Sequence, residues 1–149
     1  MAMMRRGSRG TRVLQLEGAP SDEHEEIRSQ LDEWALALGF GVNLKRLQHI
    51  QPDVFRGRLP RGLFMGDAKV SANETPDVEA TAERISKYVE WFVGQFEDGR
   101  VSHGVFAIAT DDEVAAGEWV AFLDDEFGHE AFCVQEHGAI WIACATFKA

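Results

Sequence analysis

The chain has 149 residues, of which 45% are hydrophobic and 27% are charged, and its formal net charge is −10. These values are typical of one soluble globular domain, and the negative charge argues against a nucleic-acid partner because phosphate contacts dominate such affinity. No apolar run reaches the about eighteen residues of a membrane span, and the N-terminus lacks the apolar stretch of a signal peptide. We therefore expect a cytoplasmic protein without a membrane partner.

The chain begins with a basic segment. Residues 1–20 contain four arginines and one glutamate, with little apolar pattern. This composition predicts a flexible basic tail, which is either a solvated end or an arm that touches a polyanion. Residues 21–149 are expected to form a single domain.

A helix and a strand come next. Ser21 or Asp22 can cap a helix that runs to about Leu38. The apolar residues of this helix recur at helical spacing and form the stripe Ile27, Leu31, Trp34 and Leu38. Residues 40–50 interleave apolar and polar side chains, which predicts a strand.

Residues 51–69 predict a β-hairpin. The segment from Arg58 to Gly62 has the Pro and Gly content of a turn, and strand-forming residues flank it. If the turn centres on Pro60, the numbers of two residues that face each other across the hairpin add up to 120. Asp53 then lies opposite Asp67. Lys69 shares the face of Asp67 because side chains alternate along a strand.

This arrangement brings two acids and one amine to one point. Directly opposed like charges on a hairpin destabilise it, so Asp53 and Asp67 need a cation between them or a raised pKa. A hard cation such as Mg²⁺ beside a water molecule suits these groups. Two other interpretations remain open: a structural Asp67–Lys69 salt bridge with a solvated Asp53, or two aspartates that diverge.

The rest of the chain alternates helices and strands. We expect a helix from Thr75-Pro76 to about residue 97, a buried parallel strand over residues 103–109, a helix from a capping box at Thr110 to about residue 127, and a hairpin of residues 131–135 and 139–147 around Glu136-His137-Gly138. Cys133 and Cys144 lie in apolar strand-like contexts, and we expect buried reduced thiols rather than a disulfide.

The sequence Pro52-Asp53, thirteen intervening residues and then Asp67-Ala68-Lys69 resembles the motif of the PD-(D/E)XK nuclease superfamily. The resemblance implies an α/β fold with a three-layer restriction-endonuclease-like core of order α-β-β-β-α-β. To this core the present chain would add a C-terminal helix and a β-hairpin. It also implies that Asp53, Asp67 and the carbonyl of Ala68 bind Mg²⁺ or Mn²⁺, while Lys69 positions or activates the attacking water.

The same resemblance suggests supporting residues on two helices. Family members often supply a further metal-linked acid from the first helix, and Glu23 lies within about 40° of the predicted stripe. The alternative is a first-turn acid that interacts with the helix dipole. Some relatives carry a Gln-x-x-x-Tyr pair on the second helix, where this chain has Arg84 and Tyr88. Arg84 would clamp a phosphate, although a surface arginine beside a core-edge tyrosine fits the pattern equally well.

The distribution of charge favours a phosphate-bearing substrate. Between Lys45 and Lys69 there are six basic residues and two acidic ones, whereas residues 111–130 contain eight acidic residues and no Lys or Arg. Three of these basic residues, Arg56, Arg58 and Arg61, would grip a phosphate backbone.

We therefore predict a metal-dependent endonuclease, a hydrolase that cleaves phosphodiester bonds in DNA. The alternative is a catalytically silent protein of the same fold that acts as a nucleic-acid-binding or assembly module. A chain of this length would embrace a duplex more easily as a homodimer.

Overall fold

The computed structural model describes residues 22–128, 130–136 and 140–148. The elements, in chain order, are α2 (Asp22–Ala37), β1 (Val42–Asn43), β2 (Val54–Arg58), β3 (Gly62–Lys69), α3 (Glu79–Glu97), β4 (His103–Thr110), α4 (Glu113–Phe127), β5 (Phe132–Glu136) and β6 (Ile140–Lys148). The tail predicted over residues 1–20, the candidate cap Ser21 and residues 137 and 138 of the last predicted turn lie outside the described residues.

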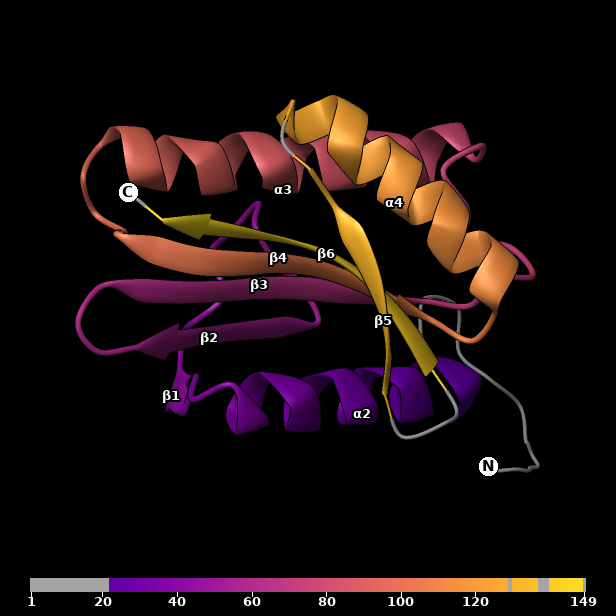
Figure 1. Cartoon of the computed structure of the whole chain (residues 1–149), viewed down its shortest axis with the longest axis horizontal. Helices are drawn as coiled ribbons and strands as arrows, with labels where there is room; N and C mark the ends of the chain where they lie inside the picture. Colours follow the sequence, from indigo (N-terminus) through magenta and orange to yellow (C-terminus); the bar gives the residue numbers. More distant parts are fainter. Residues whose placement is uncertain (1–21, 129, 137–139, 149) are drawn as a thin grey trace.

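The strands form one mixed sheet of six strands in the order β1-β2-β3-β4-β6-β5. Strands β3 and β4 are parallel, and the other neighbouring pairs are antiparallel. Helix α2 covers one face of the sheet, while α3 and α4 cover the other (Figure 1). The fold is therefore α/β, as the alternation of elements in the sequence predicts, and the helices and the sheet form three layers (Figure 1).

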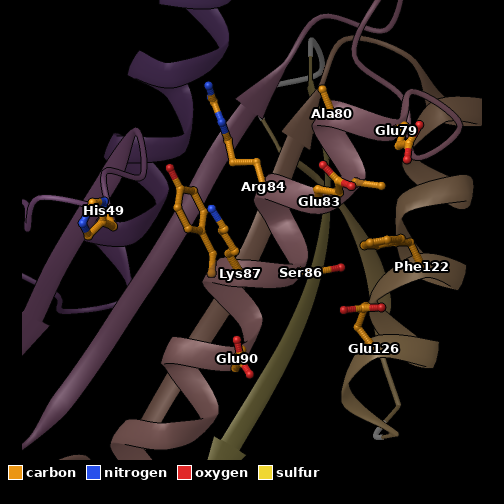
Figure 2. Close-up of a pocket in the computed structure, with 12 residues that line it drawn as sticks. His49, Glu79, Ala80, Glu83, Arg84, Ser86, Lys87, Glu90, Phe122 and Glu126 are labelled. Carbon is orange, nitrogen blue, oxygen red and sulfur yellow. The ribbon is translucent and has the colours of Figure 1, made fainter.

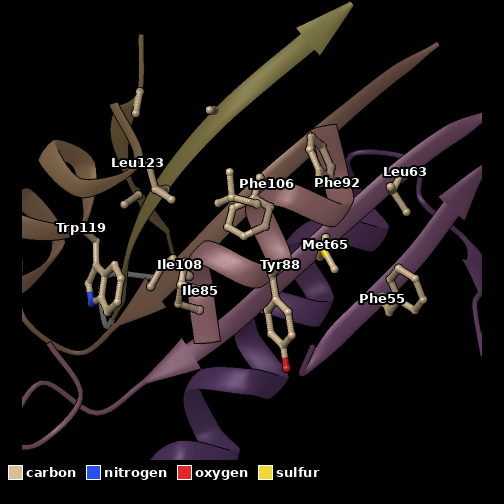
Figure 3. Close-up of a cluster of buried hydrophobic side chains, with 14 of the residues drawn as sticks. Phe55, Leu63, Met65, Ile85, Tyr88, Phe92, Phe106, Ile108, Trp119 and Leu123 are labelled. Atoms are coloured by element: carbon tan, nitrogen blue, oxygen red, sulfur yellow. The ribbon is translucent and has the colours of Figure 1, made fainter. Parts of the chain in front are cut away.

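Strand β3 packs against helices on both of its faces. Its residues Phe64 and Ala68 join a core cluster with Ile27 and Leu31 of α2. The side chains that alternate with them face α3 and α4, where the second cluster lies (Figure 3); its members from β3, α3 and α4 include Leu63, Met65, Ile85, Phe92 and Trp119. Within the described part of the chain, the buried polar residues are Asp67, Lys69 and Thr110. Two of these three lie at the C-terminal end of β3, where the sequence predicts the site.

The strand predicted over residues 40–50 is largely absent. Only Val42 and Asn43 pair with β2, and the chain then loops to the start of the hairpin. Two apolar side chains of the predicted alternation, Val42 and Leu47, remain 43% and 45% exposed, whereas Leu44 packs partly buried against the core. A turn closed by the Leu47 amide, which donates to the Ile50 carbonyl at 3.0 Å, replaces the strand.

Two helix starts and one cysteine also differ from the sequence prediction. Helix α3 begins at Glu79 rather than at Thr75-Pro76, because the Val78 amide donates to the Thr75 carbonyl and closes a separate turn. Helix α4 is capped by Asp112 and not by Thr110, which is the last residue of β4.

Both cysteines are free thiols as expected, but Cys133 is exposed and only Cys144 is buried. None of the helices in the described segments combines the length and apolar character that a bilayer span requires.

Candidate functional site

The hairpin register brings the two aspartates together. Val54 pairs with Gly66 and Phe55 with Met65, so facing positions sum to 120 as predicted. One step beyond the ladder, the Asp53 amide donates to Asp67 Oδ1 at 2.8 Å. The Ala68 amide in turn donates to Asp53 Oδ2 at 2.8 Å. Each carboxylate is thus held by an N–H of the opposite strand, and the predicted proximity is confirmed.

Lys69 completes a buried cluster with these acids. Its Nζ lies 3.1 Å from Asp67 Oδ2, and the two side chains are only 2% and 3% exposed. The second contact of the ammonium is Glu74, whose Oε2 lies 3.8 Å away. Glu74 follows β3 in a tight turn, and its Oε1 accepts the Val70 amide at 2.9 Å. A salt bridge between Asp67 and Lys69 therefore exists, but Asp53 is part of the same cluster and is not solvated apart from it.

The first helix contributes a histidine instead of the predicted glutamate. His24 Nε2 lies 3.1 Å from Asp53 Oδ2, whereas Glu23 is exposed. The buried face of α2 consists of Ile27, Leu31 and Ala35. At 100° per residue, the centre of that face lies about 20° from His24 and about 80° from Glu23. The sequence-based stripe uses Trp34 and Leu38 in place of Ala35, which rotates the inferred face toward Glu23.

Burial and charge act in opposite directions on the acids. Burial raises the pKa of Asp67 to about 6, against the lowering effect of the Lys69 ammonium. Burial also opposes the ionisation of Asp53, but the hydrogen bonds from His24 and the Ala68 amide outweigh it and lower the pKa of Asp53. The hydrogen bond to Asp53 raises the pKa of His24. Asp67 is consequently the carboxylate that carries unfavourable buried charge.

The cluster as a whole has an excess of negative charge. Three carboxylates, of Asp53, Asp67 and Glu74, face the ammonium of Lys69 and the imidazole of His24. The net charge is −1 when His24 is protonated and −2 when it is neutral. Uncompensated charge in a buried site is costly, so an additional cation would stabilise this arrangement.

Tyr88 borders the site from α3. Its side chain is 5% exposed, and its hydroxyl points away from the other labelled side chains of the core cluster (Figure 3). Burial raises the pKa of Tyr88, and the negative charge of Asp67 contributes to this increase. The tyrosine therefore lies close enough to Asp67 for the two to interact electrostatically.

Arg84, by contrast, is exposed one turn earlier on α3. It lines a cleft of about 1000 Å³ between the helices and the loop that carries His49 (Figure 2). The charged side chains in the same cleft are Arg84, Lys87, Glu79, Glu83, Glu90 and Glu126. Because carboxylates outnumber cations there, this cleft does not suit a phosphate.

The predicted phosphate-binding arginines of the hairpin are engaged elsewhere. Arg56 forms two hydrogen bonds with Asp32, at 2.7 and 3.1 Å. The Arg58 guanidinium lies 4.5 Å from the ring centroid of Phe40 and donates to His103. Arg61 donates to the Gly99 carbonyl at 3.0 Å.

Arg58 and Arg61 flank the hairpin turn, whereas the acids lie at the opposite end of β3. Gly62 and Asp67 are five positions apart, which corresponds to about 17 Å along a strand. The structure therefore does not bring Arg58 and Arg61 to the site.

The donor set suits a hard divalent cation by its chemistry. Carboxylate and backbone carbonyl oxygens, as offered by Asp53, Asp67 and Ala68, are the ligands that Mg²⁺ and Mn²⁺ prefer. Within residues 22–128, 130–136 and 140–148, no three His, Cys, Asp or Glu side chains are already arranged as a metal-binding group. Backbone amides, Lys69 and His24 contact Oδ2 of Asp53 and both carboxylate oxygens of Asp67. Cation binding would require these oxygens to exchange some of their protein donors for the ion.

The raised pKa of Asp67 predicts how the stability of the metal-free protein depends on pH. Because the folded-state pKa of Asp67 is about 6 rather than 3.8, its stabilising contribution is present below pH 3.8 and is lost as the pH rises through about 6. We therefore expect Asp67→Asn to become more stable relative to wild type between about pH 4 and pH 7. Urea denaturation in the presence of EDTA measures this difference.

Neither Asp53 nor His24 changes its contribution to stability between about pH 4 and pH 6. The contribution of Asp53 is lost as the pH falls below its usual value of 3.8, because its pKa is lowered. The contribution of His24 is lost above its usual value of 6.5, because its pKa is raised. An unfolding free-energy difference between wild type and Asp67→Asn that stays constant from about pH 4 to pH 6 would contradict the environment described for Asp67.

Comparison of the chain with models of protein families, with curated proteins and with solved structures gives no match.

Proposed function

We propose that this chain is a divalent-metal-dependent nuclease that hydrolyses phosphodiester bonds in DNA. The observation that carries the proposal is the buried cluster of Asp53, Asp67 and Lys69, in which each aspartate accepts an amide of the opposite strand and negative charge is in excess. The observed order α2-β1-β2-β3-α3-β4 agrees with the α-β-β-β-α-β order of a restriction-endonuclease-like core. This agreement supports the resemblance that the motif indicates.

In this proposal Asp53, Asp67 and the carbonyl of Ala68 would hold Mg²⁺ or Mn²⁺. A cation bound there would lower the pKa of a water molecule and neutralise charge on the phosphate. Asp67 and Glu74 hold the Lys69 ammonium in place, where it would orient the attacking water. His24 and the Ala68 amide fix the rotamer of Asp53, so the first-helix residue acts by positioning a ligand. Tyr88, which is 5% exposed, would border the site from the α3 side.

The direct test is cleavage of supercoiled plasmid and of branched DNA by the purified chain with Mg²⁺, Mn²⁺ or Ca²⁺. We expect nicking or linearisation with Mg²⁺ or Mn²⁺ and none with EDTA. Asp67→Ala is the matched inactive variant. Equal activity in Asp67→Ala and wild type would show that any nuclease in the preparation is a contaminant and would refute the proposal.

A second candidate is a catalytically silent module that binds nucleic acid through the same fold. It is favoured by the near-complete burial of Asp67 and Lys69 and by the internal hydrogen bonds of the carboxylates. This candidate predicts retained DNA binding, no cleavage with either metal, and no metal-induced rise in Tm.

A further inference from the structure

A small polar pocket lies beside Asp53 at the edge of the sheet. It has a volume of about 150 Å³ and lies where the short strand β1 leaves the edge of β2 uncovered. This volume equals that of about five water molecules, which is enough for a phosphate group. The charged and amide side chains that line the pocket are Arg28, Asp32, Asn43, Arg46, Asp53 and Arg56. The pocket is thus continuous with the proposed metal ligand.

The three arginines of the pocket differ in how far their charge is neutralised. Arg56 forms two hydrogen bonds with Asp32, and both side chains are largely shielded, with 11% and 26% exposed. Arg28 forms three hydrogen bonds with Glu25, but this pair lies at the surface, with the two side chains 31% and 53% exposed. A surface pair of that kind contributes at most about 1 kcal/mol and exchanges partners readily. Arg28 is therefore accessible to another anion, whereas Arg56 is not.

Arg46 carries the least compensated charge. Its Nε donates to the Pro52 carbonyl at 2.8 Å, and its Nη2 donates to the Asp53 carbonyl at 2.9 Å. Among the contacts of the described residues, Arg46 has no carboxylate partner. A guanidinium has five N–H donors, so about three remain for an anion after these two bonds. The carbonyl bonds also hold the planar group in one orientation, which reduces the entropy lost when an anion binds.

We propose that Arg28 and Arg46 form a subsite for a phosphate of the nucleic-acid backbone that neighbours the scissile one. The choice of ligand rests on the proposed function, since the pocket adjoins Asp53. The subsite replaces the contacts that the sequence assigns to Arg58 and Arg61, which lie at the other end of the sheet. Bidentate contacts of arginine with phosphate oxygens are the chemistry that would recognise this ligand.

The salt dependence of binding tests the subsite without requiring catalysis. Fluorescence anisotropy would measure the Kd of labelled duplex DNA, and of duplex RNA of the same sequence, in EDTA at about 50 to about 200 mM KCl. The proteins are wild type, Arg28→Gln, Arg46→Gln and the distant control Arg58→Gln. Each subsite variant should bind duplex DNA about 10-fold more weakly and lower the slope of log K against log salt by about 0.9. Arg58→Gln should match wild type.

The outcomes separate this inference from the proposed function. Any of three results would overturn the two-arginine subsite. These are an unchanged salt slope in either folded subsite variant, a loss of affinity in Arg58→Gln as large as in the subsite variants, and no binding of either duplex by wild type. If Arg46→Gln does not fold, Arg28→Gln decides, because Arg28 contributes only a surface ion pair. Reduced slopes without cleavage under any metal would support the subsite and refute the nuclease. Metal-dependent cleavage with unchanged salt slopes in the variants would support the nuclease and refute the subsite.

Discussion

Replacing Asp67 with asparagine should reduce metal-dependent DNA cleavage by about 10²–10³-fold, which is the loss expected when one preorganised electrostatic group is removed. The asparagine side chain keeps the size of the aspartate but cannot supply the negative charge that a divalent cation requires. The rise in Tm caused by Mg²⁺ or Mn²⁺ should disappear in the same variant. Initial rates of plasmid nicking and thermal unfolding with and without metal measure the two effects.

Asp112→Asn provides the matched control for this prediction. Asp112 caps α4 through the Ala115 amide, and it plays no part in the cluster around Asp67. Asparagine caps a helix as well as aspartate does, so this variant should retain the cleavage rate and the metal-induced rise in Tm. If Asp67→Asn behaves like Asp112→Asn in both measurements, Asp67 neither binds a metal nor participates in the reaction.

Replacing Lys69 with methionine should reduce both stability and activity. Methionine fills a similar volume, but it leaves the buried Asp67 carboxylate without its ammonium partner. Removal of one partner from a buried ion pair costs about 3–5 kcal/mol. We expect the full loss at about pH 8 and a smaller one at about pH 5, because burial already raises the pKa of Asp67 to about 6 and its protonation removes the unpaired charge. Cleavage should fall by about 10²-fold or more, as expected when the group that orients the reacting water is lost.

The double variant Asp67→Asn/Lys69→Met isolates the cause of the instability. It contains neither charge, so it should recover part of the free energy of unfolding that Lys69→Met loses. Urea denaturation of the four proteins at both pH values completes the double-mutant cycle. A Lys69→Met protein as stable as wild type at about pH 8 would mean that the Asp67 carboxylate does not depend on the ammonium.

The parts of the site that sequence reasoning predicts are those determined by local geometry. The period of two along a strand and a turn centred on Pro60 together fix the hairpin register, and that register places Asp53 beside Asp67 and aligns Lys69 with them. The α/β alternation of elements follows from apolar periodicity in the same way. No long-range information is needed for either inference.

The remaining parts depend on tertiary contacts or on angles finer than the sequence pattern can resolve. Choosing between Glu23 and His24 requires the buried face of α2 to be known within about 50°, which is half of the rotation per residue. Residues 44–53 form a loop in which the side chain of Arg46 bonds to two carbonyls farther along the chain, a contact that no local pattern encodes. Glu74 reaches Lys69 only because its turn folds back on the end of β3.

The arginines illustrate the same limit. The segment rich in basic residues between Lys45 and Lys69 includes Arg46 of the proposed subsite, but its composition does not indicate which end of a strand each residue occupies. Arg58 and Arg61 lie near the turn and bind Phe40, His103 and Gly99. Arg28 lies outside the segment and reaches the pocket from α2.

A crystal soaked in Mn²⁺ tests the central claim most directly, because anomalous scattering locates the ion independently of the protein atoms. The account predicts one anomalous peak in coordination contact with oxygens of both Asp53 and Asp67, with Lys69 still buried beside them. The absence of an anomalous peak between the two aspartates at saturating Mn²⁺ would contradict it, provided that their carboxylates are fully occupied and keep their bonds to the Ala68 amide, His24 and Lys69.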